Sequence, residues 1–585
     1  MKEKWVTLAK KADFYGLAEK FHIDPVIVRL IRNRDVNETD MEKYLHGSLD
    51  DLYDPSLLKG AQEGADLLKE RIAAQDPIRI IGDYDIDGVN STYILYRGLQ
   101  DCGADVDYAI PHRIKDGYGL NRNLIDLAAQ DGRRVILTCD NGIAAAEEIA
   151  YAKSLGMCVI VTDHHEVPFD MVAGERVQKL PPADCVIDPK QAGCAYPWKE
   201  ICGAVVAYKF LQVLYRTMGK EPQALEPLIQ FAAFATVGDV MPLQDENRIL
   251  VTHGLKQMNE TKNIGLRALI TQNKIEEVQC YHLGFVLGPC VNATGRLKSA
   301  DEAIRLLLSE SEEEAEQIAN ELISLNNERK ILTEQGTEEA KAQIDEAPWK
   351  DESVYVVHLP LCHESVAGII AGRLREAYNK PIFVLTGTGP VLKGSGRSIE
   401  AYSMFEEMNC CKDLFTKFGG HPMAAGLSLP IEHLEEMRTR LNQHATLQPE
   451  DFVLKRKIDM RMPLEYISER LIDQLRLIEP CGTANPKPVF AENKAVVKRA
   501  TRMGAEQNHL RLILVGEGGV EMTGLYFREA ESFLDSYRAA FGEAEERNLL
   551  IGRGTRALPF CYYPSVNTFR GNTSLQVMIT GVLFQ

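Results

Sequence analysis

Residues 78–88 read IRIIGDYDIDG, an apolar run of strand length that ends directly in three aspartates. The same pattern recurs at residues 135–142 (VILTCDNG) and at residues 158–165 (CVIVTDHH). Helix-like stretches at Ile143–Leu155 and Ala204–Met218 follow these runs along the chain. Strands that alternate with helices are typical of β-α units, so the sequence predicts an α/β domain built on a parallel sheet.

The acidic and histidine side chains that follow these strands are expected to meet in one cleft. In an open parallel sheet the carboxyl ends of the strands line one edge, and ligands bind there. A further aspartate follows the apolar helix predicted at Phe231–Val237. The candidate set is Asp83, Asp85, Asp87, Asp140, Asp163, His164, His165 and Asp239.

A pair of divalent metal ions explains why so many carboxylates gather. Without cations, burial and mutual repulsion would raise their pKa values. Mixed His and Asp ligands favour Mn²⁺ over Ca²⁺ or a thiolate-bound zinc, and two metals about 3.5–4 Å apart activate water for attack on phosphorus. An EF-hand is excluded because the loop follows a strand and its twelfth position is Ile94 rather than glutamate. The predicted chemistry is hydrolysis of a phosphodiester or phosphoanhydride.

Composition sets the class of protein. The 585 residues suggest three to four domains, and 45% hydrophobic with 26% charged residues is ordinary globular composition. The formal charge of 66 − 84 = −18 argues against a histone-like coating protein.

The 13 cysteines form no C-x-x-C pair, which favours reduced thiols. The first residues lack the apolar core of a signal peptide, and the apolar stretch Ile201–Tyr215 is too short to span a bilayer, so we expect a cytoplasmic protein without membrane contact.

The chain is expected to divide into four parts. Residues 1–300 form the parallel-sheet domain, with an N-terminal extension at 1–75, and the Ala/Glu/Leu/Lys-rich residues 301–347 form a long connecting helix. Residues 348–450 repeat the α/β pattern and include a Gly-rich turn at 387–396. Residues 451–585 read as all-β and suit a small OB-type barrel. The strands expected there are Phe452–Ile458, Ala495–Val497, Leu510–Val515, Glu521–Tyr526 and Gln576–Thr580.

The motifs GDYDIDG, CDNG, DHH and GDV, in this order, resemble those of the DHH phosphoesterases. Later motifs are similar to those of the branch of that family that degrades single-stranded DNA from the 5′ end. They are GPCVNATGRL (288–297), HESVAGIIAGRL (363–374), GSGRS (394–398), GGHPMAAG (419–426) and PCGTANPKPVF (480–490). The resemblance covers nearly the whole chain and implies a DHH domain, a DHH-associated domain and a terminal OB-type barrel.

The resemblance assigns expected roles to individual residues. Those that match the family's metal ligands are Asp85, Asp87, Asp140, His164 and Asp239, with Asp83 and Asp163 beside them as ligands or orienting groups. His165 matches the histidine that faces the scissile phosphate and, with Asp140 and Asp163, forms the expected catalytic set. Residues expected to hold phosphate or DNA are Arg113, Asn292, Arg296, Ser395, Arg397 and His421. The chain departs from the family pattern at Cys290, Ser365, Ala484 and Lys487, none of them a proposed ligand.

The expected function is therefore metal-dependent release of 5′-mononucleotides from the 5′ end of single-stranded DNA, in recombination and repair. Mn²⁺ is the expected metal, with Mg²⁺ as the other candidate, and a single-strand-binding protein or a helicase is a candidate partner. Lys455-Arg456-Lys457 and Lys498-Arg499 are candidate backbone contacts or ordinary solvated strand ends. Two alternatives stay open: a small-substrate DHH phosphodiesterase acting on oligoribonucleotides, phosphoadenosine phosphate or cyclic dinucleotides, and a non-catalytic nucleic-acid scaffold.

Overall fold

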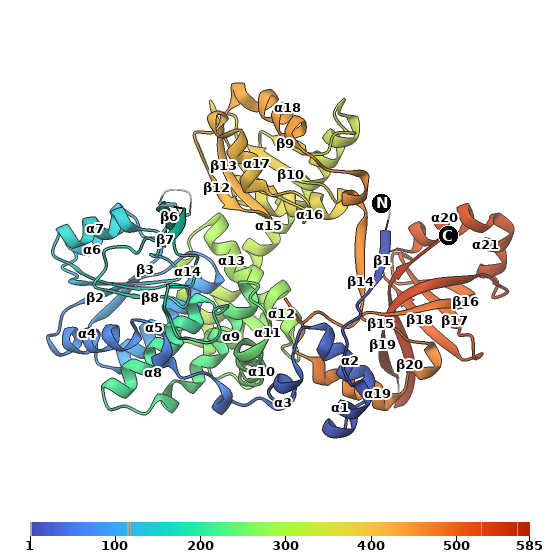
Figure 1. Cartoon of the computed structure of the whole chain (residues 1–585), viewed down its shortest axis with the longest axis horizontal. Coiled ribbons are helices and arrows are strands. Elements are labelled where there is room, and N and C mark those ends of the chain that lie inside the picture. Colours follow the sequence, from blue (N-terminus) through green and yellow to red (C-terminus); the bar gives the residue numbers. More distant parts are fainter. Residues whose placement is uncertain are drawn as a thin grey trace. The chain divides into compact units, whose positions relative to one another are not determined.

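The computed structural model describes residues 3–113, 116–117, 119–172, 174–527, 529–569 and 571–584. The chain forms two compact units (Figure 1). The first spans Leu49–Leu454, and the second joins Glu3–Ser48 to Lys455–Gln585. No described helix combines the length and apolar character needed to cross a membrane.

A five-stranded, all-parallel sheet forms the base of the first unit; the predicted parallel sheet is confirmed, but two of its strands, β3 and β8, were missed. Its strands are β2 (Ile78–Ile81), β3 (Val106–Ala109), β4 (Val135–Cys139), β5 (Cys158–Thr162) and β8 (Cys185–Ile187). The order is β3-β2-β4-β5-β8, and each neighbouring pair is parallel. The chain adds β3 on one side of β2 and then crosses to β4 on the other. The topological switch point, where such sheets bind ligands, therefore lies between β2 and β4.

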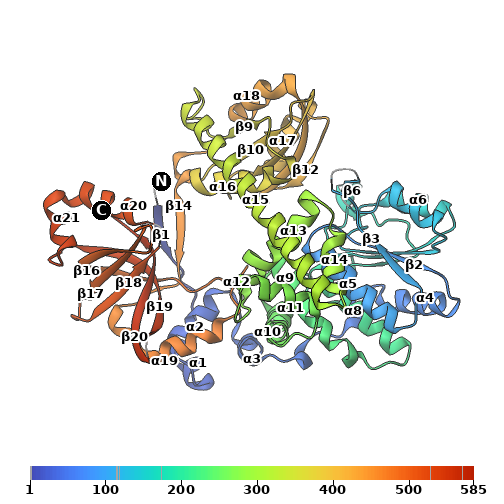
Figure 2. The same cartoon turned by 180° about the vertical axis from the view of Figure 1, so that it is seen from behind.

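Helices cover both faces of this sheet (Figure 1, and from behind in Figure 2). One face carries α4 (Ala61–Ala73), α5 (Ile86–Asp101) and α8 (Gly203–Thr217), and the other carries α6 (Arg122–Gln130) and α7 (Ala146–Ser154). Within β2, Ile78 and Ile80 join the first core while Ile81 joins the second. Burial on both faces explains why these strands read as continuous apolar runs rather than as alternating patterns. A small hairpin, β6 (Phe169–Val172) with β7 (Glu175–Gln178), lies exposed after β5.

A helical layer follows the sheet and corrects one prediction. Its elements are α9 (Ile229–Gly238), α10 (Asp245–Asn259), α11 (Ile264–Gln272), α12 (Cys280–His282), the π-helical turn η5 (Leu283–Leu287), α13 (Gly288–Leu297), α14 (Asp301–Leu308) and α15 (Glu312–Glu346). The single connecting helix predicted over 301–347 is two helices. The side chain of Ser311 accepts a hydrogen bond from the Glu314 N–H and starts α15 as its N-cap, so the polar stretch before it is a turn.

The second α/β layer of this unit has a mixed sheet of order β12-β13-β11-β10-β9. Its elements are β9 (Tyr355–Leu359), α16 (Ala367–Tyr378), β10 (Ile382–Thr386), β11 (Val391–Arg397), α17 (Met404–Cys410), β12 (Lys417–His421), β13 (Ala424–Pro430) and α18 (Leu434–His444). The Gly-rich turn predicted at 387–396 is wrong over its second half, which belongs to β11. A Cβ on Gly394 would lie 2.6 Å from the Leu385 side chain, and one on Gly396 would lie 2.5 Å from Met404 Sδ. These glycines therefore allow close packing within a strand rather than a turn.

A closed β-barrel forms the second unit. Its strands are β16 (Phe490–Met503), β17 (His509–Val515), β18 (Glu521–Tyr526), β19 (Ala557–Phe569) and β20 (Asn572–Val582). The order β16-β17-β18-β20-β19 closes because β16 also pairs with β19, which suits the predicted five-stranded OB-type barrel. The prediction missed β19 and gave β18 its observed bounds. Two helices, α20 (Ala530–Phe541) and α21 (Glu543–Leu550), lie between β18 and β19.

The N-terminal residues belong to this second unit, which corrects their assignment to the 1–300 domain. Strand β1 (Glu3–Thr7) pairs with β14 (Leu454–Ile458), and the helices α1 (Phe14–Phe21), α2 (Pro25–Asn33) and α3 (Met41–His46) follow. The apolar face of α2, including Ile27 and Ile31, shares a core with Leu471 of α19 (Glu469–Leu475). Apolar complementarity with a segment more than 400 residues away cannot be read from local patterns.

Candidate active site

The loop after β2 folds back on the start of α5. Asp85 caps that helix, since its Oδ1 accepts hydrogen bonds from the N–H groups of Asp87 and Gly88 at 3.0 and 3.1 Å. A Cβ on Gly88 would lie 2.3 Å from the Asp83 carbonyl oxygen, so glycine is required for this close approach. The loop thereby brings Asp83, Asp85 and Asp87 to the switch point of the sheet.

Asp87 is fully buried against the N-terminus of α8. Its Oδ2 accepts a hydrogen bond from Gly203 N at 2.6 Å, and its Oδ1 accepts one from Ala204 N at 2.8 Å. Backbone N–H groups at a helix N-terminus stabilise an anion, so they hold this carboxylate in one orientation.

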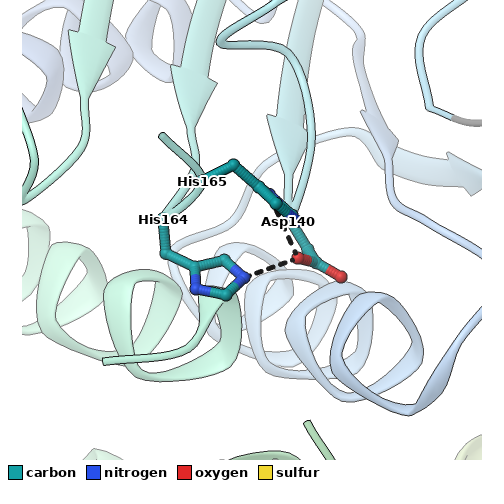
Figure 3. A group of neighbouring side chains, drawn as sticks. All are labelled: Asp140, His164 and His165. Atoms are coloured by element: carbon teal, nitrogen blue, oxygen red, sulfur yellow. Dashed lines mark hydrogen bonds and ion pairs between the residues drawn. The ribbon is translucent and has the colours of Figure 1, made fainter. Parts of the chain in front are cut away.

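His164 lies among three carboxylates. Its Nε2 is 3.1 Å from Asp140 Oδ1, 3.4 Å from Asp87 Oδ2 and 3.8 Å from Asp239 Oδ2. Asp140 follows β4 with a φ of 60°, a left-handed conformation that is uncommon outside glycine. Figure 3 shows the His164 ring pointing at the Asp140 carboxylate, with His165 on the other side. The two strand ends therefore converge as the sequence predicted.

His165 is held mainly by Asp163, and its Nδ1 also lies 3.9 Å from Asp140 Oδ1. Its Nδ1 donates to Asp163 Oδ1 at 2.7 Å, while Asp163 Oδ2 accepts from Ile143 N at 2.9 Å. Asp163 is 1% exposed, and its Oδ1 also accepts from His164 N at 2.8 Å. With both oxygens engaged inside the protein, Asp163 orients His165, whose half-exposed ring presents Nε2 for other contacts.

The carboxyl groups of the cluster have raised pKa values, as expected of acids that are ionised only when cations are bound beside them. Burial and neighbouring carboxylates raise the pKa of Asp83, Asp85 and Asp140 above the ordinary value, and raise the pKa of Asp239 to about 8. Burial lowers the pKa of His164, which keeps its imidazole neutral and able to bind a metal.

His165 and Asp163 behave differently from the rest of the cluster. Burial opposes protonation of His165, but the hydrogen bond that His165 donates to Asp163 and the nearby carboxylates raise the pKa of His165 to about 9. Burial also opposes ionisation of Asp163, yet the two histidines hold the pKa of Asp163 below its ordinary value. This pair is a carboxylate with an imidazolium at neutral pH.

The donor atoms fit divalent metals. Three groups each place their ligand atoms within 4.8 Å of one another: Asp83, Asp85 and Asp140; Asp87, His164 and Asp239; and Asp140, His164 and His165. Asp83 Oδ1 is buried without a hydrogen-bond partner, as expected of an atom that awaits a cation. Oxygen and imidazole donors without thiolate are the set that suits Mn²⁺ or Mg²⁺.

A cavity of about 200 Å³ joins the loop after β2 to the second sheet of the same unit. Its lining includes Tyr84, Arg113, Glu364, Lys393 and Ser395. The Arg113 guanidinium lies 5.0 Å from the centroid of the Tyr84 ring, which fixes its position by a cation–π contact.

Two further arginines approach this region. Arg296 Nη1 donates to the Ser365 carbonyl at 2.6 Å, and Arg397 follows Ser395 by two residues on the same face of β11. Among the described residues, no carboxylate lies within ion-pair distance of Arg296 or Arg397. Burial, with Arg113 second, lowers the pKa of Arg296 to about 10, and burial also lowers the pKa of Arg397. Half-buried arginines without a carboxylate partner suit an anionic ligand such as phosphate.

Two predicted substrate residues lie elsewhere. Asn292 Oδ1 accepts a hydrogen bond from Ile86 N at 2.8 Å, so this amide braces the aspartate loop. His421 lies exposed at the end of strand β12. Cys290, where the family pattern has a basic residue, is fully buried and accepts from Asn326 Nδ2 at 3.4 Å.

The sequence reading missed residues that the structure places beside the site. Asp188 directly follows β8 and is fully buried, and burial followed by the charge of Asp163 raises the pKa of Asp188 to about 8. Asp140 was predicted because it follows a strand of the parallel sheet. Asp188 follows β8 in the same way, but this short strand was not predicted. Tyr84 and Lys393 line the 200 Å³ cavity; Tyr84 lies within the motif GDYDIDG but was given no role, and Lys393 lies just before the motif GSGRS.

Comparisons with known proteins agree with this geometry. Residues 77–237 match the DHH family, N-terminal domain; residues 351–446 match the DHHA1 domain; and residues 458–581 match the RecJ OB domain. The single-stranded-DNA-specific exonuclease RecJ of Salmonella typhimurium is 31% identical over 96% of both chains. RecJ of Bacillus subtilis is 37% identical over 86% of this chain, and the match spans 63% of that longer protein. The crystal structure of Thermus thermophilus RecJ with Mn²⁺ superposes with a TM-score of 0.82 and 27% identity, over all of this chain and 80% of that one.

A parallel sheet whose strand ends gather aspartates and an Asp-His-His motif, followed by a DHHA1 domain, defines a DHH-type phosphoesterase. Within this class, the chain is similar to RecJ over nearly its full length and carries a RecJ OB domain. The chain belongs to the RecJ family of single-stranded-DNA-specific exonucleases.

Proposed function

We propose that this chain hydrolyses single-stranded DNA from its 5′ end and releases 5′-mononucleotides. The carrying observation is that the acidic and histidine cluster and the cavity lined by Arg113 lie in one compact unit and share the loop Asp83–Asp87, whose Tyr84 lines the cavity. A site for two metals beside a site for phosphate is what exonucleolytic hydrolysis needs.

Two divalent ions, Mn²⁺ or Mg²⁺, are assigned to the cluster. Asp83, Asp85 and Asp140 would hold one, and Asp87, His164 and Asp239 would hold the other. When bound, such a metal pair polarises the phosphoryl group and supplies a nucleophile from water at neutral pH. Asp140, whose Oδ1 lies 3.1 Å from His164 Nε2, is placed to serve both ions.

His165 acts on the scissile phosphate. With Nδ1 donating to Asp163, we assign the Nε2 N–H of the protonated ring to a phosphoryl oxygen, to which it would donate as negative charge develops there. Asp163 keeps the ring charged and in place but does not itself reach the substrate.

The cavity lined by Arg113 and Ser395 holds the 5′-terminal phosphate. Arg113 and Ser395 would bind it together with the nearby Arg296 and Arg397, whereas the charge of Lys393 at the cavity wall is paired with Glu364 at 3.1 Å. A fixed 5′ phosphate sets the register, because the next phosphodiester bond then lies over the metal cluster. His421 is a candidate contact for the strand beyond the cavity.

The barrel of the second unit is proposed to hold the incoming strand. Arg456 is paired with Glu3 and Lys498 with Glu521, so these two charges are partly neutralised. Lys455 and Lys457 lie exposed on β14 and are the better candidates for backbone contacts. A single-strand-binding protein or a helicase as partner, and the cytoplasm as location, complete the proposal.

The test is digestion of a 5′-phosphorylated, 3′-labelled single-stranded 30-mer with Mn²⁺, beside its duplex and a labelled dinucleotide. We expect the single strand to give a shrinking ladder of 3′-labelled products and to release 5′-mononucleotides. The duplex should be spared. The Asp140→Asn variant is the control and should give no ladder. Loss of the dinucleotide alone would assign the centre to a small-substrate phosphodiesterase, and metal-dependent binding without turnover would assign it to a scaffold.

A further inference from the structure

An exposed aromatic pair stands on the continuous helical segment formed by α12, η5 and α13. Tyr281 is 61% exposed and Phe285 is 70% exposed. Their rings stack on one another, with centroids 5.1 Å apart and planes 21° from parallel. Two large aromatic side chains side by side in solvent mark an interaction surface more often than a single exposed residue does.

The π-helical turn directs this pair outward. Leu283 and Leu287, at the two ends of η5, are fully buried, while Phe285 between them faces solvent. A π turn inserts a residue into the helical repeat, and such turns are frequent at functional sites. The segment thus keeps its packing face while presenting an aromatic face.

The helical segment that carries the pair packs against residues next to the metal-binding cluster. A Cβ on Gly284 would lie 3.7 Å from Val237 Cγ1, and Val237 precedes Asp239 by two residues. A Cβ on Gly288 would lie 3.1 Å from Ile86 Cδ1, and Ile86 separates Asp85 from Asp87. The residues on both sides of Phe285 therefore rest against segments that carry proposed metal ligands.

The opposite end of the same segment reaches the phosphate cavity. A Cβ on Gly295 would lie 2.3 Å from the Tyr84 carbonyl oxygen, and Arg296 follows it. The 11 residues from Phe285 to Arg296 span about 16 Å at about 1.5 Å of rise per residue. Along this segment the aromatic pair comes first, the residues that pack next to the metal cluster follow, and Arg296, proposed to hold the 5′ phosphate, comes last.

We propose that Tyr281 and Phe285 form a stacking platform for bases on the 3′ side of the scissile phosphate. This inference rests on the proposed function, in which Arg296 holds the 5′-terminal phosphate. A strand anchored there and cleaved at the cluster continues toward the aromatic pair. Aromatic faces bind bases of any sequence, which suits an enzyme that degrades DNA without sequence preference.

The experiment uses 5′-phosphorylated 20-mers that carry one abasic residue at each of positions 2 to 6 in turn. With the full-length protein and Mn²⁺, an abasic residue at the stacked position should raise KM about 5- to 150-fold, the range for one stacked base. Phe285→Ala and Tyr281→Ala should raise KM on intact DNA and be insensitive to the abasic residue at that position. Phe405→Ala, which removes a 43% exposed aromatic from α17, is the matched control and should behave as wild type.

A second readout does not depend on the alanine variants folding. A tryptophan in Phe285→Trp should be quenched by an intact oligonucleotide bound without metal, and less by one abasic at the stacked position. The platform is overturned if the abasic profile is the same in wild type and Phe285→Ala, or if the tryptophan does not respond. If wild type does not digest the intact single strand at all, the proposed function fails instead, so the two failures are distinguishable.

Discussion

Replacing Asp163 by asparagine tests how the cleft positions His165. The Asp163 carboxylate accepts from His165 Nδ1 at 2.7 Å and from Ile143 N at 2.9 Å, and it is 1% exposed. Hydrogen bonds to charged groups contribute about 1.5–3 kcal/mol each. Loss of the charged bond to His165 should therefore lower kcat about 10- to 150-fold, at about 1.4 kcal/mol per factor of ten. KM should change little, because Asp163 touches no substrate.

The assay is steady-state release of mononucleotides from a 5′-phosphorylated 30-mer, with thermal unfolding measured in parallel. Asp126→Asn is the matched control, since Asp126 accepts a 2.6 Å hydrogen bond from the Tyr151 hydroxyl in the same domain. The pH profile adds a signature: protonation of His165 should be lost at lower pH in Asp163→Asn, because the neighbour that raises the pKa of His165 is gone. Wild-type kcat with an unchanged pH profile would refute the reasoning.

Three further predictions concern other parts of the molecule. Gly368→Ala should raise KM for 5′-phosphorylated DNA and leave KM for 5′-hydroxyl DNA unchanged. The added Cβ would lie 3.0 Å from Arg397 Nη2 and 3.3 Å from Ser395 Oγ, two groups proposed to bind the 5′ phosphate. Equal effects on both substrates would count against that phosphate site. Without metal, the protein should lose thermal stability as pH rises from about 4 to 8 and change little above that, because a carboxyl such as Asp239, with its pKa raised to about 8, favours folding only while protonated, and Mn²⁺ should restore most at high pH; differential scanning fluorimetry checks the sign. A protein limited to residues 49–454 should bind long single strands more weakly than the full chain but cleave bound substrate at a similar rate. Fluorescence anisotropy measures the affinity, and an unchanged value would mean that the barrel does not bind the DNA.

Local patterns predicted β2, β4 and β5 well because these strands are short, fully buried and end at the aspartates and histidines of the cluster, whereas the half-buried β3 gave no such pattern. Strands β2 and β5 have the predicted bounds. The convergence of Asp140 with His164 followed from one rule, that the carboxyl ends of parallel strands share an edge.

Other features depend on contacts that no local pattern encodes. Residues 3–48 join the barrel because α2 packs on α19, far away in the chain. Gly394 and Gly396 look like turn residues but serve close packing inside β11. Asn292 resembles a substrate contact because of its motif, yet its hydrogen bond goes to Ile86 N.

The most direct test of the account is a titration of metal-free protein with Mn²⁺, reading bound ions by electron paramagnetic resonance and single-strand hydrolysis in the same sample. The account predicts no hydrolysis without metal and full activity as the second ion per chain is bound, with both lost in Asp140→Asn. Hydrolysis by metal-free protein, or full occupancy by Mn²⁺ without hydrolysis of the 5′-phosphorylated strand, would contradict it.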